Sequence, residues 1–170
     1  MRQIKINSTI GNEIITIQDV KDYARIDTSA DDSLIGLMIE TARLWCENYI
    51  SRDIVSKNRT YYLDATTSGL IDLPFSPVAS IESVTINDEA ATYAILGLNN
   101  ETIELDGGAA EKVKITYITE GINNALTKQA MLQTISTNYD NRADFIEGSG
   151  VHLIPTNAKT ILSSYKSMFV

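Results

Sequence analysis

TIQDVKDYARIDTSADDSLIGLMIETARLWCENYIS, residues 16–51, is the stretch that decides the fold, because it predicts two consecutive amphipathic helices. Thr16 is a typical N-cap residue, and Asp19 three positions later can complete a capping box, so a short helix is expected to run to about Ile26. Residues 27–32 then supply turn and cap residues for the next helix. The chain therefore begins its helical part with a helix, a turn and a second helix.

The second helix, expected over about residues 31–51, carries apolar side chains on two sides. Leu37 and Leu44 share the side opposite the expected core face, where Glu40 also lies. Exposed leucines are common in monomers, so these two are either solvated or buried against a neighbouring subunit. The expected core face spans an arc of about 140° and comprises Leu34, Ile35, Met38, Ile39, Ala42, Trp45, Cys46 and Tyr49.

Between Lys57 and Gly121 the apolar period changes from about 3.6 to 2, which predicts short antiparallel strands. Turn-forming residues separate six of them, expected at 59–63, 70–73, 81–86, 92–96, 102–105 and 112–118. The two prolines of residues 73–78 indicate a rigid connector between strands. Residues 1–15 are interpreted as an edge strand or hairpin arm.

Helical spacing returns after Gly121. One helix is expected at about 124–141, then a loop around Gly148, then a last helix that begins near Pro155. Its apolar stripe continues almost to the final Val170, so the chain end is expected to dock on the chain's own helices or on a partner. The predicted class is α+β: one domain in which segments 1–56 and 122–170 form a small helical bundle and segment 57–121 is an inserted antiparallel β meander.

Composition excludes several classes of function. The net charge is −8, and segment 57–121 has only 4 Lys and Arg against 10 Asp and Glu, so no segment offers the basic surface that DNA binding requires. No apolar run approaches the roughly 20 residues of a membrane span. With a single cysteine and no signal-peptide pattern, a reducing cytoplasm is the expected compartment.

No catalytic, cofactor-binding or metal-binding residue is predicted. His152 is the sole histidine, so neither a histidine metal site nor a Ser-His-Asp triad has its partners. Cys46 falls on the core face of its helix and is interpreted as a buried structural thiol. Gly148-Ser149-Gly150 and Asp106-Gly107-Gly108 lack the remaining residues of a serine elbow and of a phosphate loop.

An ordered set of segments resembles the phage head-tail connector family, also called head-completion or neck adaptor proteins. The segments are ITIQDVKDYARID, DDSLIGLMIETARLWCENYISRDI, LPFSPVASIESVTI, KITYITEG, LTKQAMLQTISTNYDNRADF and SSYKSMF. The resemblance implies a structural virion protein, made in the bacterial host cytoplasm, that forms a ring, by resemblance a dodecamer, in the virion neck. Its implied partners are the portal and tail or stopper proteins, and DNA would pass through the lumen without sequence-specific binding.

Two surfaces are candidate sites under this resemblance. A closed ring needs two different faces on each subunit, and Leu37, Glu40 and Leu44 are expected at the subunit interface. The chain end, with Tyr165, Lys166, Met168 and Phe169, is expected to dock on the portal or on an adjacent subunit. The alternatives are a tail-completion or tail-terminator ring protein of a phage, and a bacterial adaptor unrelated to phage.

Overall fold

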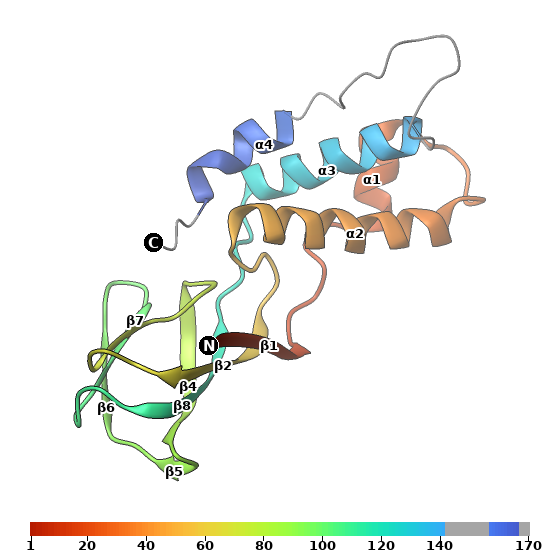
Figure 1. Cartoon of the computed structure of the whole chain (residues 1–170). Helices are drawn as coiled ribbons and strands as arrows, with labels where there is room; N and C mark the ends of the chain where they lie inside the picture. Colours follow the sequence, from red (N-terminus) through yellow and green to blue (C-terminus); the bar gives the residue numbers. More distant parts are fainter. Residues whose placement is uncertain (142–156, 167–170) are drawn as a thin grey trace. The chain divides into compact units, whose positions relative to one another are not determined.

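The computed structural model describes residues 1–141 and 157–166, which divide into two compact units (Figure 1). The strand unit contains Met1–Asn12 and Ser51–Ile122, and the helical unit contains Glu13–Ile50 and Asn123–Lys166. The expected α+β class is confirmed. Residues 1–12, assigned by sequence to the same segment as the helical pair, are part of the strand unit because they pair with a strand there.

The helical unit is built around α3 (Ala125–Asp140), which packs against α1 (Ile17–Ala24), α2 (Asp32–Ile50) and α4 (Asn157–Leu162). A single 3-10 turn, η1 (Ser163–Tyr165), follows α4. The core of this unit is formed by apolar side chains of all four helices: Val20, Ile35, Ile39, Ala42, Cys46, Ala130, Met131, Ile135, Ala158 and Leu162.

The first helix begins as its sequence predicts. The Asp19 backbone N–H donates to Thr16 Oγ1 at 3.1 Å, and Asp19 Oδ2 accepts from the Thr16 N–H at 2.7 Å, which completes the capping box. These hydrogen bonds lower the pKa of Asp19, the bond from the Thr16 backbone being the largest cause. The helix ends slightly before the predicted Ile26, because Arg25 takes a left-handed conformation with φ of 56°.

The strand unit contains two antiparallel sheets. The five-stranded sheet has the order β1-β2-β8-β4-β5 and the three-stranded sheet the order β3-β7-β6. Their bounds are β1 Arg2–Thr9, β2 Lys57–Ala65, β3 Leu70–Asp72, β4 Val78–Ile86, β5 Glu89–Ala90, β6 Tyr93–Leu96, β7 Thr102–Leu105 and β8 Glu111–Thr119. Each of the six predicted strands is present, and β1 confirms the edge strand expected within residues 1–15.

The strand order departs from the predicted meander. β8 pairs with β2 on one side and with β4 on the other, so strands far apart in sequence are neighbours. β8 suits this central place because its Val113, Ile115 and Tyr117 are fully buried while Lys112 and Lys114 face solvent. The predicted connector is present as residues 73–77 between β3 and β4, since Val78 already begins β4. The Tyr117 hydroxyl donates to the Pro74 carbonyl at 2.7 Å.

Candidate subunit interface and buried ion networks

One side of α2 is apolar and exposed. Leu37 is 61% exposed and Leu44 is 40% exposed, and Glu40 between them is exposed as well. We call these three residues the outer face of α2. Their spacing of three, four and seven places them on one side of the helix, as the sequence predicts. The structure thus leaves two large apolar side chains exposed on one side of α2, about two turns apart.

The buried side of α2 differs from the predicted core face in two respects. Ile35, Ile39, Ala42, Cys46 and Ile50 are buried. Leu34, Met38, Trp45 and Tyr49 are only half-buried, and the two aromatic rings stack with centroids 5.8 Å apart. Two charged residues, Arg43 and Glu47, complete the buried set.

Arg43 is held by two carboxylates within the helical unit. Its Nε donates to Glu13 Oε1 at 2.9 Å and to Oε2 at 3.0 Å, and its Nη1 donates to Glu47 Oε2 at 3.1 Å. Burial alone would lower the pKa of Arg43, but the hydrogen bond to Glu13 and the nearby carboxylates outweigh burial and raise the pKa. The network therefore fixes the segment that precedes α1 to α2.

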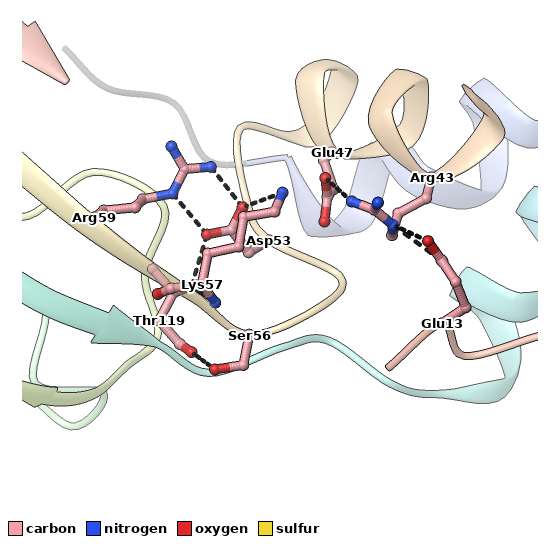
Figure 2. A network of polar contacts seen from close by, with 8 residues as sticks. All are labelled: Glu13, Arg43, Glu47, Asp53, Ser56, Lys57, Arg59 and Thr119. Carbon is pink, nitrogen blue, oxygen red and sulfur yellow. Dashed lines mark hydrogen bonds and ion pairs between the residues drawn. The ribbon is translucent and has the colours of Figure 1, made fainter. Parts of the chain in front are cut away.

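A second network lies in the strand unit and centres on Asp53, which is fully buried (Figure 2). Its carboxylate accepts hydrogen bonds from Arg59 Nη2 at 2.6 Å and Nε at 2.8 Å, from Lys57 Nζ at 3.1 Å and from Thr119 Oγ1 at 2.7 Å. Lys57 and Arg59 are themselves 2% and 4% exposed. One carboxylate thus connects the loop before β2, the start of β2 and the end of β8.

The charges of this network keep Asp53 ionised. Burial is the largest influence and by itself would raise the pKa of Asp53. The hydrogen bonds from Arg59 and Thr119 and the positive charges of Arg59 and Lys57 together outweigh burial, so the pKa is lowered. The Arg59 guanidinium also lies 3.6 Å from the centroid of the Phe75 ring, which adds a cation–π contact. These contacts hold the loop before β2 to β2 and β8, which is a structural role.

Local sequence patterns predict neither network. Charged residues are usually exposed, and Asp53 and Thr119 are separated by 66 positions, so spacing does not connect them. One signal was present. Every second residue of this strand, from Lys57 and Arg59 to Tyr61 and Leu63, points to the same face of the sheet. Both cations therefore lie on the strand face that carries the apolar residues.

Cys46 is a buried free thiol, as expected. Burial, with a smaller contribution from the Glu47 charge, raises its pKa to about 12. A thiol that stays protonated at neutral pH is a poor nucleophile and a poor metal ligand. Within the described residues, no group of three or more His, Cys, Asp and Glu side chains is placed to hold a metal ion.

The chain-end residues lie partly outside the described ranges. Tyr165 is half-buried at the end of η1, and Lys166 Nζ lies 5.3 Å from the centroid of the Tyr49 ring, so Lys166 contacts α2 of the same unit. Met168, Phe169, His152 and the Gly148 loop lie outside the described residues. No described helix has the length and apolar character to cross a bilayer.

Comparison with known proteins gives one family match. The family model described as phage gp6-like head-tail connector protein matches residues 14–104, more than half of the chain. No curated protein matches this sequence.

Solved structures share the fold. One, described as "Neck of empty GTA particle computed with C6 symmetry", superposes with a TM-score of 0.77 at 16% identity, covering 99% of this chain and 97% of the other. A second, "Neck of native GTA particle computed with C12 symmetry", gives a TM-score of 0.74 at 14% identity with the same coverage. A third, "Virion of native gene transfer agent (GTA) particle", gives 0.71 at 16% identity, again with the same coverage. At these identities the likeness establishes the fold.

Proposed function

The chain belongs to the family of phage gp6-like head-tail connector proteins, and we propose that it forms a ring under the portal that joins the DNA-filled capsid to the tail. It acts as a structural part of the virion neck, with the portal and tail or stopper proteins as partners, and has no catalytic role or cofactor. The particle is assembled in the bacterial host cytoplasm. The ring is a dodecamer, a number supported by the C12 symmetry used for a neck structure of the same fold.

The outer face of α2 is the observation that carries this proposal. Identical subunits close into a ring only through two different surfaces that fit each other. Leu37 and Leu44 are 61% and 40% exposed on a helix whose opposite side already has its own core, so they are not needed to hold the subunit together. Burying one such side chain contributes roughly 1.5–3 kcal/mol. We assign this face to the contact with the neighbouring subunit.

The charge of segment 57–121, which makes up most of the strand unit, agrees with a passage for DNA. Segment 57–121 carries 4 basic against 10 acidic residues, and two of the basic ones, Lys57 and Arg59, are buried on Asp53. The cations that remain on its surface are too few to hold the phosphate backbone. A wall of this charge lets DNA slide past without sequence-specific binding.

Replacement of both leucines with glutamate tests the interface. Leu37→Glu with Leu44→Glu should abolish rings in negative-stain images and sedimentation, while the far-UV circular dichroism of the subunit stays unchanged. The matched control is Ile17→Glu with Leu126→Glu, which adds the same charge at positions 36% and 43% exposed on α1 and α3. Intact rings in the first variant, or rings lost equally in both variants, would contradict the assignment.

We also propose that the chain end docks on the portal or on an adjacent subunit. Tyr165, Lys166, Met168 and Phe169 combine aromatic, cationic and apolar groups over a few residues. Deletion of residues 165–170 should weaken portal binding, measured by biolayer interferometry. Lys159→Ala is the control, since it removes an exposed cation of α4 that lies outside the docking residues. Full-length affinity in the deletion variant would refute the docking role.

Imaging with both candidate partners separates a connector from a tail terminator. The purified chain is mixed with portal protein and, separately, with tail-tube protein, and the complexes are examined by electron microscopy. A connector is expected as an added ring against the portal. A ring that caps the tail tube and ignores the portal would overturn the proposal.

A further inference from the structure

The strand unit has four sheet-end strands, β1 and β5 in the five-stranded sheet and β3 and β6 in the three-stranded sheet, and β1 and β6 are the longer one of each pair. In the part of the chain that the structure describes, β1 pairs only with β2, at one end of the five-stranded sheet, and β6 pairs only with β7, at one end of the three-stranded sheet. All eight residues of β1 are exposed. The two edges lie on opposite sides of this unit (Figure 1). Each therefore offers a row of backbone donors and acceptors to an added strand.

Both edges leave isoleucines of the core-facing side uncovered. Ile4 is opposite the buried Tyr61 and points to the same face of the sheet, yet it is 39% exposed. Ile6, two positions on, is 45% exposed. On β6, Ile95 is opposite the fully buried Ile103 and is 47% exposed. At each edge, the apolar face of the sheet therefore extends to the last strand, where no further strand covers its isoleucines.

Charge favours pairing of one edge with the other. β1 carries Arg2 and Lys5, whereas β6 carries no charge and lies beside Glu104 of β7, which is exposed. Pairing of β1 with β1 of a second copy would bring Arg2 and Lys5 of both copies onto one edge. Pairing of β6 with β6 would likewise gather the acidic side chains. Pairing of the basic β1 edge with the uncharged β6 edge, which lies next to Glu104, avoids this repulsion between like charges.

We propose that β1 of one copy pairs antiparallel with β6 of the next copy, so that the strand units of neighbouring subunits form a continuous sheet. In the register that fits best, Ile4 lies opposite Ile95 and the two core faces join. Lys5 then lies opposite Ala94, the smallest side chain of β6, and reaches across it toward Glu104, which is the β7 partner of Ala94. This inference rests on the ring of the proposed function and adds a second contact between its subunits. The contact uses two different surfaces, as a ring requires.

Engineered cysteines test the pairing directly. Directly opposed residues of antiparallel strands have Cα atoms about 4.5–5.5 Å apart, which suits a disulfide. The native Cys46 is buried with a pKa of about 12 and does not compete. Rings of Ile4→Cys/Ile95→Cys protein assembled on portal should give a ladder of covalent oligomers on a non-reducing gel. The control Ile4→Cys/Leu70→Cys, in which Leu70 of β3 is 54% exposed, should stay monomeric.

A charge exchange provides a second measurement that needs no cysteine. Lys5→Glu should lower the association constant of each interface about two- to five-fold, and Lys5→Glu/Glu104→Lys should restore it. The pairing would be overturned if rings form normally, Ile4→Cys/Ile95→Cys gives no ladder and Lys5→Glu leaves the association constant unchanged. That result would leave the connector role intact. A covalent dimer with Ile4→Cys alone would also overturn it, since it would show β1 paired with β1. Absence of wild-type rings on portal would instead refute the ring itself.

Discussion

Asp53 is predicted to be the most sensitive polar side chain of the strand unit. Asp53→Asn keeps the shape of the residue but removes the charge that compensates Lys57 and Arg59, both at most 4% exposed. It also puts an amide NH₂ where one of the carboxylate oxygens accepts hydrogen bonds from two side chains. Breaking a buried ion pair from one side costs about 3–5 kcal/mol. For a chain of this size, that corresponds to a fall in Tm of roughly 6–20 °C.

The assay is thermal and urea unfolding of the full chain at pH 7, followed by far-UV circular dichroism. The control is Asp88→Asn, which breaks an exposed pair with Lys114 in the same unit and should leave Tm nearly unchanged. Asp53→Leu/Lys57→Met/Arg59→Met removes all three charges and should recover part of the loss. Equal Tm values for Asp53→Asn and Asp88→Asn would refute the role assigned to the network.

The same network makes stability depend on pH. The pKa of Asp53 is lower in the folded than in the unfolded chain, where it is about 3.9. Its contribution is therefore fully present above the unfolded pKa and is lost as the pH falls through the folded pKa. Wild-type Tm should fall more steeply than that of Asp53→Asn as the pH is lowered below about 4. Parallel curves for the two proteins would contradict this.

Three further predictions concern single positions. Gly121→Ala should lower the free energy of unfolding by about 1–3 kcal/mol in urea titrations, because its Cβ would lie 2.5 Å from the Ile54 carbonyl oxygen. Gly36→Ala should raise it by about 0.5–1 kcal/mol, because a Cβ at this position of α2 meets nothing within 4 Å. The reverse order of the two stabilities would show that the steric reasoning is wrong. Cys46 should react with a thiol reagent orders of magnitude more slowly in the native chain than in urea, and equal rates would exclude its burial. Thr16→Ala should lower stability by about 0.5–2 kcal/mol through loss of the α1 cap, whereas Thr16→Ser should not.

Local features of the fold could be predicted from the sequence because their causes are local. The Thr16 and Asp19 capping box, the span of α2 and the six strands follow from residues within a few positions of one another. The exposure of Leu37 and Leu44 follows from helical period alone. The outer face of α2 is therefore predicted as a surface by the sequence alone.

Features that depend on distant parts of the chain could not be predicted in this way. β8 lies between β2 and β4, which are distant from it in sequence. This order depends on how the strands pack together in the folded chain, and no local pattern predicts it. The burial of Arg43 depends on Glu13, 30 positions earlier, and that of Asp53 on Thr119. The core-facing position of Ile4 depends on its pairing with Tyr61, which is 57 positions later in the sequence.

The central position of β8 also constrains how the chain folds during synthesis. β2 and β4 do not pair with each other. Both pair with β8, which is made later in synthesis because it begins at Glu111. A nascent chain emerges from the ribosome at about 5–20 residues per second, so the earlier strands leave it seconds before their shared partner. During that interval, apolar strand segments are open to wrong pairing, and contacts of such sequence separation form slowly. Ribosome-bound chains that end before Glu111 should therefore lack the five-stranded sheet.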